Sequence, residues 1–226
     1  MVGSSPMNEA TPMIDSEGVV KFRLEFTPAP AVAATLIAEL NAWRTLLFRL
    51  GLNGCDPMRY GGLAYGNVSR RLDGRRILVS GTQTGGLPEL SAEHYCLVTE
   101  ADVAANRLVA KGPIRPSSEA LTHAAAYAAN PRIDYVLHVH SPEIWRRAES
   151  LSIPVTDRRV AYGTPEMAAA VDALLARGEA HIIAMGGHLD GLIAVGASIE
   201  AAALPLIRLL AEALRAGPNM GGRESP

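Results

Sequence analysis

The sequence is poor in the residues that mark several classes of protein. The chain of 226 residues contains two cysteines, and only 5% of its residues are aromatic. Cys55 and Cys96 stand far apart without a CxxC spacing, so we expect two free, buried thiols in a reducing compartment. Positive charge is not in excess, because the chain contains 21 lysines and arginines and 23 acidic residues. We therefore expect neither nucleic acid nor an anionic membrane surface as a partner.

Long apolar runs are absent as well. No run reaches the roughly 18 residues that a membrane-spanning helix needs. The polar first 18 residues also lack the basic-then-apolar order of a secretory signal. We expect residues 1–18 to be a disordered leader, residues 217–226 to be a flexible tail, and the protein to be cytoplasmic.

Aliphatic side chains are plentiful instead. Hydrophobic residues make up 48% of the chain, which is ample for a large buried core. Neither a linker-like change in composition nor an internal repeat interrupts residues 19–216. The sequence therefore predicts a single domain over that range.

Apolar periodicity predicts the order of the elements. The predicted strands are 19–26, a hairpin of 65–72 with 75–81, a strand within 91–102, 133–140, and two strands within 180–196. The predicted helices are 31–50, 117–129, a short one near 142–149, 165–177 and 198–216. Strands and helices alternate, yet hairpins connect some of the strands. This order favours an α/β fold with a mixed, largely antiparallel sheet and helices on its faces.

Two histidines fall on one face of the strand predicted at 133–140. Successive side chains of a strand point to opposite faces, so His138 and His140 share a face. The opposite face is predicted to carry Ile133, Tyr135, Leu137 and Val139. Two imidazoles side by side suit Zn²⁺ or a similar divalent ion. An isolated pair of this kind is also compatible with a half-wet sheet face that binds nothing.

The neighbouring segments favour the metal site. Glu119 opens a helix after two serines, where the helix amides stabilise its charged form, and His123 and Tyr127 follow on the same helix face. A tight turn between the last two predicted strands carries His188 and Asp190. Turn-forming Asp-Gly explains Asp190 on structural grounds, but it does not explain His188.

Three loops share an anion-binding chemistry. Residues 65–69, 81–86 and 116–118 offer small side chains, exposed amides and hydroxyls, and the last loop leads into a helix N-terminus. Such places hold phosphate well. Each loop taken singly is also an ordinary turn, and none is a Walker A or dinucleotide-binding motif.

Read in order, five segments closely resemble the class II aldolase/adducin family. They are YGNVSRR, ILVSGTQTGGLPEL, RPSSEALTHAAAY, YVLHVHSP and YGTPEM, and the resemblance covers roughly residues 33–212. The family includes fuculose-phosphate and rhamnulose-phosphate aldolases and ribulose-phosphate 4-epimerases. The resemblance implies a three-layer α/β/α domain, usually assembled as a homotetramer with active sites at the subunit interfaces.

The resemblance also implies roles for individual residues. His138 and His140 are implied as metal ligands, and Glu119 as both general acid/base and metal ligand. The metal, most often zinc, with manganese, cobalt or iron as alternatives, would polarise a substrate carbonyl while Glu119 moves a proton. The residues implied to bind phosphate are Gly66, Asn67, Thr84, Gly85, Ser117 and Ser118.

The chain departs from the family pattern in two places. The family's third histidine directly precedes Gly and an apolar strand, whereas Asp190 holds that position here and His188 stands two residues earlier. Either residue could complete the site, and the usual ligands of zinc favour His188. Residues 141–161 also form a short segment, without the longer stretch that carries a catalytic tyrosine in the fuculose-phosphate enzyme.

The leading prediction is a divalent-metal-dependent aldolase acting on a small, anionic, phosphorylated hydroxycarbonyl substrate. The same site on this scaffold also serves epimerisation, dehydration, decarboxylation or iron-dependent oxygenation, so the fold does not choose among them. A third interpretation is a non-catalytic, adducin-like assembly domain. The presence of His138, His140 and Glu119 counts against it.

Overall fold

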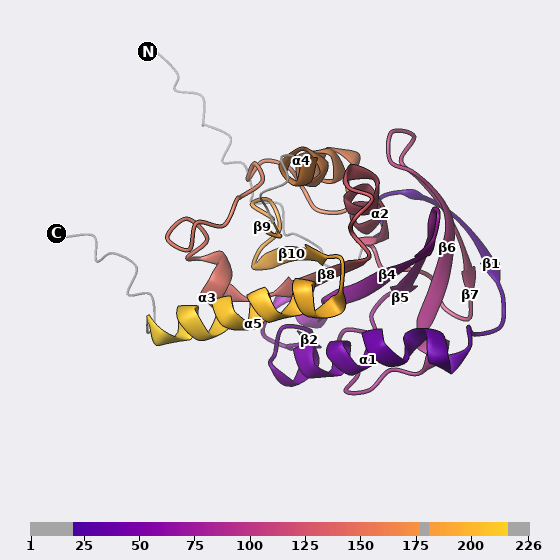
Figure 1. Cartoon of the computed structure of the whole chain (residues 1–226), viewed down its shortest axis with the longest axis horizontal. Coiled ribbons are helices and arrows are strands. Elements are labelled where there is room, and N and C mark those ends of the chain that lie inside the picture. The colour runs from indigo at the N-terminus through magenta and orange to yellow at the C-terminus, as the bar shows by residue number, and fades with distance from the viewer. Residues whose placement is uncertain (1–19, 177–180, 217–226) are drawn as a thin grey trace, which may run out of the picture.

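A single sheet of eight strands forms the centre of the computed structural model, which describes residues 20–176 and 181–216 (Figure 1). The strand order is β1-β7-β6-β5-β4-β8-β10-β9. In chain order these strands are β1 (Arg23–Pro28), β4 (Asn67–Asp73), β5 (Arg76–Ser80), β6 (Tyr95–Asp102), β7 (Arg107–Gly112), β8 (Tyr135–His140), β9 (Ile182–Ala184) and β10 (Gly191–Gly196). The edge strand β1 pairs with β7 in parallel, and the other neighbours in this sheet are antiparallel.

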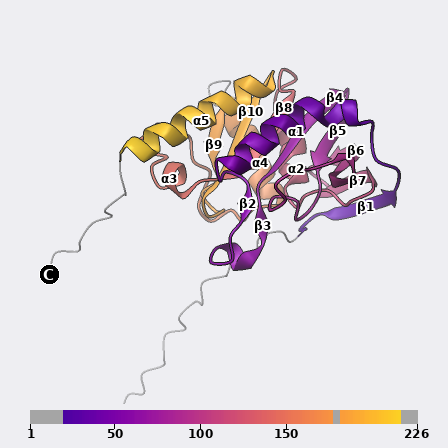
Figure 2. The same ribbon diagram turned by 90° about the horizontal axis from the view of Figure 1, so that it is seen from below.

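Helices cover both faces of the sheet (Figures 1 and 2). One face carries α1 (Ala34–Arg49), the short α3 (Pro142–Trp145) and α5 (Ile199–Arg215), and the other carries α2 (Ala120–Ala129) and α4 (Pro165–Ala176). A two-stranded ribbon, β2 (Gly54–Cys55) with β3 (Ala64–Tyr65), stands beside the sheet. The predicted α/β/α architecture with a mixed, largely antiparallel sheet is confirmed. No helix among the described residues has both the length and the apolarity to cross a bilayer.

Strand β8 has both faces buried and therefore links the two apolar cores. Leu137 and Val139 pack towards α1 and α5, whereas Val136 packs towards α2 and α4, and all three are fully buried. The alternation of side chains thus places His138 and His140 on the α2/α4 side, at the end of the strand.

Several local predictions need correction. Ile133 precedes β8, which begins at Tyr135, and it packs with the α2/α4 core rather than with Leu137. Strand β7 was not predicted, although Leu108 and Ala110 are fully buried there and alternate with the less buried Arg107, Val109 and Lys111. Both cysteines are free, but Cys55 is exposed because it lies on the β2–β3 ribbon.

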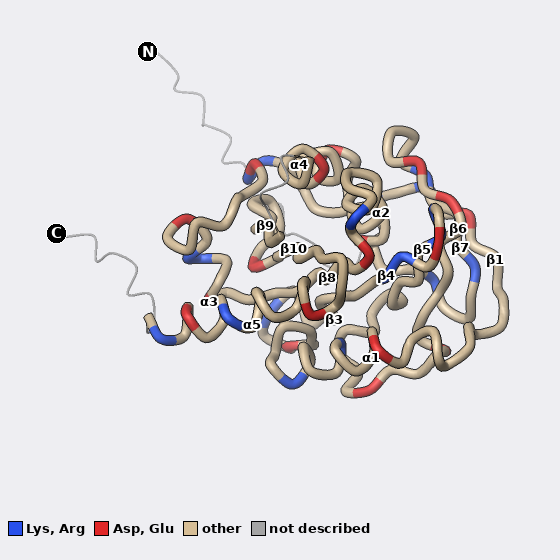
Figure 3. The backbone as a smooth tube through the Cα atoms, in the orientation of Figure 1, with Lys and Arg blue, Asp and Glu red and all other residues tan. Residues whose placement is uncertain are grey.

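The predicted leader and tail, residues 1–18 and 217–226, lie outside the described residues. The bounds predicted for the domain, 19–216, stay a prediction. Within the described part, acidic and basic residues are interspersed along the chain rather than gathered by sign (Figure 3).

Strand pairing brings the candidate site together at one end of the sheet. Asn67, the first residue of β4, is opposite His138, and Gly191, the first residue of β10, is opposite His140. The histidine end of β8 is therefore flanked by the loop that leads into β4 and by the turn between β9 and β10.

Candidate metal centre and anion pocket

Three histidines point their Nε2 atoms at one another. The Nε2 atoms of His138 and His140 are 3.1 Å apart, those of His140 and His188 are 3.1 Å apart, and those of His188 and His138 are 3.3 Å apart. None of the three residues is more than 1% exposed. Among the described residues they are the group of side chains that could hold a metal ion.

The backbone explains how His188 reaches the pair on β8. A tight turn between β9 and β10 carries it, closed by bonds from His188 N–H to the Met185 carbonyl at 3.1 Å and from Gly191 N–H to the His188 carbonyl at 3.0 Å. A Cβ at Gly191 would lie 2.4 Å from Cδ2 of the His188 ring. Glycine at that position therefore leaves the space that the ring occupies.

The geometry of the three rings fits a small divalent ion. Tetrahedral zinc with Zn–N distances of about 2.05 Å separates its nitrogen ligands by about 3.3 Å, close to the distances found here. His138 donates from Nδ1 to the Leu192 carbonyl at 3.1 Å, which leaves the Nε2 lone pair for a ligand. Such an outer hydrogen bond is the usual support of a metal-bound histidine.

Burial keeps His138 and His140 in the protonation state that a metal ligand requires. Desolvation lowers the pKa of both His138 and His140 well below the ordinary value, and the neighbouring His188 lowers it further. The rings of His138 and His140 are therefore neutral near pH 7, and the neutral imidazole is the form that binds a metal.

Asp190 is buried beside the histidines but is turned towards another segment. Its backbone has a positive φ of 63°, and its Oδ2 accepts from the Tyr60 hydroxyl at 2.8 Å and from Arg59 Nη2 at 3.4 Å. The ring of Tyr60 in turn meets the ring of His140 edge-on, with centroids 4.7 Å apart. Asp190 therefore anchors the loop that covers His140, whereas His188 joins the histidine group.

Glu119 is fully buried at the start of α2, but it is not a member of the histidine group. Its Oε2 accepts from the Thr122 hydroxyl at 2.8 Å. Its Oε1 would lie 3.9 Å from a Cβ at Gly163, next to Tyr162, whose ring centroid is 4.5 Å from that of His188. The carboxylate thus lies beside the Tyr162–Gly163 segment that packs on His188, and its predicted role as a metal ligand stays a prediction.

A small polar pocket gathers most of the residues predicted to bind phosphate. Its lining includes Gly66, Asn67, Gly85, Ser117 and Ser118, together with Ala64, Gly81, Thr82 and Gln83. Gly66 has a φ of 80°, and a Cβ at Gly85 would lie 2.1 Å from the Tyr65 carbonyl oxygen, so both positions favour glycine. Asn67 Oδ1 is buried without a hydrogen-bond partner in the described part of the chain.

Thr84 differs from the other predicted phosphate residues. It is buried, its hydroxyl donates to the Gly81 carbonyl at 2.8 Å, and it does not line the pocket. Its side chain therefore shapes the glycine-rich loop from inside.

The other two groups singled out on α2 form a buried polar network. Ser69 Oγ lies 2.7 Å from His123 Nδ1 and 2.8 Å from the Tyr127 hydroxyl. Burial lowers the pKa of His123 to about 3 and raises that of Tyr127. Both groups therefore stay neutral near pH 7, and their hydrogen bonds tie α2 to β4.

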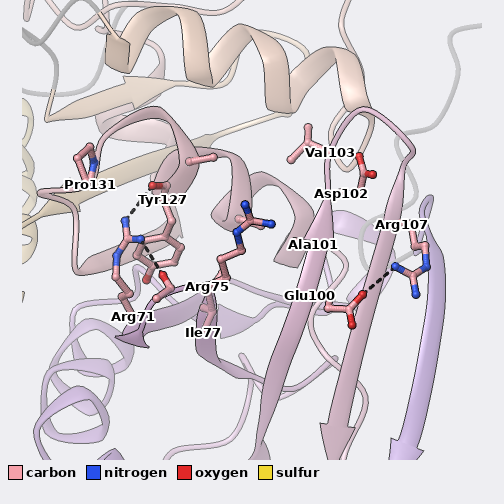
Figure 4. Close-up of a pocket in the computed structure, with 13 residues that line it drawn as sticks. Arg71, Arg75, Ile77, Glu100, Ala101, Asp102, Val103, Arg107, Tyr127 and Pro131 are labelled. Carbon is pink, nitrogen blue, oxygen red and sulfur yellow. Dashed lines mark hydrogen bonds and ion pairs between the residues drawn. The ribbon is translucent and has the colours of Figure 1, made fainter.

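A wider depression, which Tyr127 also lines, is found where β4–β7 meet the end of α2 (Figure 4). Two of its three arginines are already engaged, because Arg71 donates to the Tyr127 carbonyl at 2.8 Å and Arg107 pairs with Glu100 at 3.1 Å. None of the residues predicted to bind a metal ion or phosphate lines it.

Sequence reasoning missed the aromatic and basic residues around the site. Arg59, Tyr60 and Tyr65 surround His140, and the fully buried Tyr162 packs on His188. Tyr65 and Tyr162 each begin a segment that carries the family resemblance, so a signal for them was present. Nothing local in the sequence distinguishes Arg59 or Tyr60.

Comparison with known proteins places the chain in a family. The pattern described as Class II Aldolase and Adducin N-terminal domain matches residues 58–214, which is most of the described chain. The protein therefore belongs to the class II aldolase/adducin family, as its sequence motifs predict.

The relatives that the chain matches are named for different reactions. The chain is 40% identical over 76 residues to a 3-oxo-tetronate 4-phosphate decarboxylase of Haemophilus influenzae and 41% identical over 78 residues to a methylthioribulose-1-phosphate dehydratase of Xanthomonas euvesicatoria. Each match covers 34% of this chain and only 33% or 32% of the relative. The fold is shared with an L-fuculose-1-phosphate aldolase from Thermus thermophilus at a TM-score of 0.59 and 22% identity, over 81% of this chain and 93% of that one.

The histidine group makes a direct prediction about metal content. Replacing His188 by alanine should weaken zinc binding by more than about 100-fold, because losing a ligand costs more than losing a group that merely orients one. Asp190→Asn is the matched control, since asparagine tolerates the positive φ and Asp190 faces Tyr60. Elemental analysis and competition with a chelator measure both variants. Greater metal loss in Asp190→Asn than in His188→Ala would reverse the assignment.

The buried His123 predicts a pH dependence of stability in the metal-free protein. The unfolded chain takes up a proton below about pH 6.5, whereas the folded protein resists protonation of His123 down to about pH 3. Stability is therefore full above pH 6.5 and falls between pH 6.5 and 3, by about 1.4 kcal/mol per pH unit for this group. His138 and His140 add a slope of the same sign.

Urea unfolding from pH 7 to pH 4 measures this effect. His123→Gln should flatten the acid slope by about one proton, while His181→Gln, which removes an exposed histidine, should leave it closer to that of the wild type. Equal slopes for His123→Gln and wild type would show that His123 is not held neutral.

Proposed function

We propose that the protein is a divalent-metal-dependent aldolase that cleaves or forms a C–C bond in a small, phosphorylated hydroxycarbonyl compound. The observation that carries the proposal is the convergence of three buried Nε2 atoms within 3.3 Å of one another beside a polar pocket. Strand pairing of Asn67 with His138 joins the two features directly.

His138, His140 and His188 would hold the ion through their Nε2 atoms. Three neutral nitrogen ligands suit zinc, with manganese, cobalt and iron as alternatives. When bound, a divalent ion supplies Lewis-acid polarisation of a substrate carbonyl or hydroxyl. The closely packed Tyr60 and Tyr65 rings would limit water around His140.

The polar pocket would hold the phosphate of the substrate. Gly66 and Gly85 allow close approach of backbone amides, and Asn67, Ser117 and Ser118 supply side-chain hydrogen bonds. The pocket also borders the start of α2, where the helix dipole favours an anion. Thr84 would contribute through the shape of the loop.

Glu119 would carry the proton. It follows Ser118 in the chain, and its Oε1 lies beside Gly163, the neighbour of the Tyr162 that packs on His188. A substrate whose phosphate occupies the pocket and whose carbonyl faces the histidines would therefore lie close to Glu119. Its carboxylate would accept a proton from a substrate hydroxyl during cleavage and return it to the carbon that is released.

Dehydration or decarboxylation of a sugar phosphate is the second candidate. The favouring observation is local sequence similarity to a dehydratase and a decarboxylase whose named substrates are both phosphorylated. Both reactions, like aldol cleavage, develop negative charge next to a polarised carbonyl, so the same groups serve them. Epimerisation and iron-dependent oxygenation remain alternatives on this scaffold.

A non-catalytic assembly domain does not account for the histidine group. A domain that only assembles does not need three buried imidazoles that face one another. Apolar side chains in their place would be buried at a lower cost in free energy. The predicted homotetramer and cytoplasmic location stay predictions.

Turnover by the metal-loaded protein tests the proposal. Dihydroxyacetone phosphate with a panel of aldehydes should give a new C–C bond, detected by mass spectrometry, and inorganic phosphate should compete. Loss of water or carbon dioxide from phosphorylated ketoses, without aldol product, would select the second candidate. Equal turnover of unphosphorylated analogues would contradict the proposal that the substrate carries a phosphate.

Glu119→Gln predicts a specific kinetic defect. General acid/base groups contribute about 10²–10⁴-fold, so kcat should fall by that factor while glutamine keeps the size and hydrogen bonding of the side chain. Metal content measured in parallel separates a proton carrier from a metal ligand. Near-normal kcat in metal-replete Glu119→Gln would show that another group moves the proton.

A further inference from the structure

Arg44 of α1 is a buried cation without an acidic partner. Its side chain is 1% exposed, and no carboxylate among residues 20–176 and 181–216 forms an ion pair with it. Desolvation lowers the pKa of its guanidinium. Burying a charge in this way is costly unless its surroundings compensate for the lost water.

The compensation comes from one loop. Nη2 donates to the carbonyls of Thr84 at 2.8 Å and Gly85 at 2.7 Å, and Nη1 donates to Pro88 at 3.3 Å and also to Leu87. The planar guanidinium thus holds four carbonyl oxygens of residues 84–88, the segment that follows Gln83 at the edge of the anion pocket.

The direction of these carbonyls determines where the amides point. In a planar trans peptide the carbonyl and the following N–H point opposite ways. Because the carbonyls of Thr84 and Gly85 face Arg44, the N–H groups of Gly85 and Gly86 face away from it. Within the described chain neither N–H group has a hydrogen-bond acceptor, and Gly85 lines the pocket.

We propose that Arg44 is a positioning residue that sets the anion affinity of this pocket without touching the ligand. Its guanidinium holds the Thr84 carbonyl so that the N–H group of Gly85, which lines the pocket, stays available to an anion, and its charge, which lacks a carboxylate partner, attracts a phosphate from behind the loop. The ligand class is a phosphate monoester or phosphate itself. This inference rests on the proposed function, because it takes the pocket as the phosphate subsite.

Calorimetric titration of the zinc-loaded, full-length protein with inorganic phosphate tests the role. Arg44→Met should weaken phosphate binding by about 10- to 100-fold, the size expected for a full charge acting across a loop in partly buried surroundings. Zinc affinity should change by less than about threefold. Arg49→Met is the matched control, because it removes the same charge from an exposed position of α1 and should bind phosphate like the wild type.

Arg44→Lys separates the charge from a merely structural role. Lysine keeps the charge but cannot hold four carbonyls, so it should bind phosphate at least about threefold more tightly than Arg44→Met. Equal affinity of the two variants, or wild-type affinity in a folded Arg44→Met protein, contradicts the role of Arg44 alone. Absence of phosphate binding to the wild-type protein contradicts the proposed phosphate substrate as well.

A measurement on the wild-type protein covers the case in which the variants do not fold. In a ¹⁵N-labelled sample, phosphate should shift the amide resonances of Gly85 and Gly86 and the Nε resonance of Arg44. Saturable phosphate binding that leaves these three resonances unmoved would overturn the inference.

Discussion

The site depends on one constraint: three buried imidazole rings converge through their Nε2 atoms at the end of β8. Removing polar nitrogens from water costs free energy, and His138 cannot donate from Nε2 to its neighbours, because the single proton of its neutral ring lies on Nδ1 and is donated to the Leu192 carbonyl. His138, His140 and His188 would hold a divalent ion through their Nε2 lone pairs, and such an ion would offset this cost. Binding energy of this kind stabilises the fold that presents the ligands.

The surrounding structure serves this arrangement at several levels. The sheet register sets His138 opposite Asn67 and His140 opposite Gly191, so the histidine centre and the polar pocket have a fixed separation. The turn before β10 supplies His188, and the same turn directs Asp190 to Tyr60. Tyr60 and Asp190 both adopt positive φ, and backbone strain of this kind in non-glycine residues is common at functional sites.

The sequence predicted the features that follow from periodicity. Strand alternation placed His138 and His140 together, and the ordered motifs identified the family and five residues that line one small polar pocket. The direction of the Asp190 side chain could not be predicted from periodicity, because it depends on a backbone dihedral angle and on Tyr60, 130 positions away in the chain. The contacts of Arg44 could not be predicted either, because its partners are backbone carbonyls, which do not appear in the pattern of side chains.

Zinc K-edge X-ray absorption of the purified, zinc-loaded wild-type protein tests the central claim most directly. The account predicts a mononuclear site with three imidazole nitrogens at about 2.0–2.1 Å and the remaining coordination from oxygen. A sulfur scatterer at about 2.3 Å, or fewer than three imidazoles around the ion, would contradict the histidine centre and with it the mechanism built upon it.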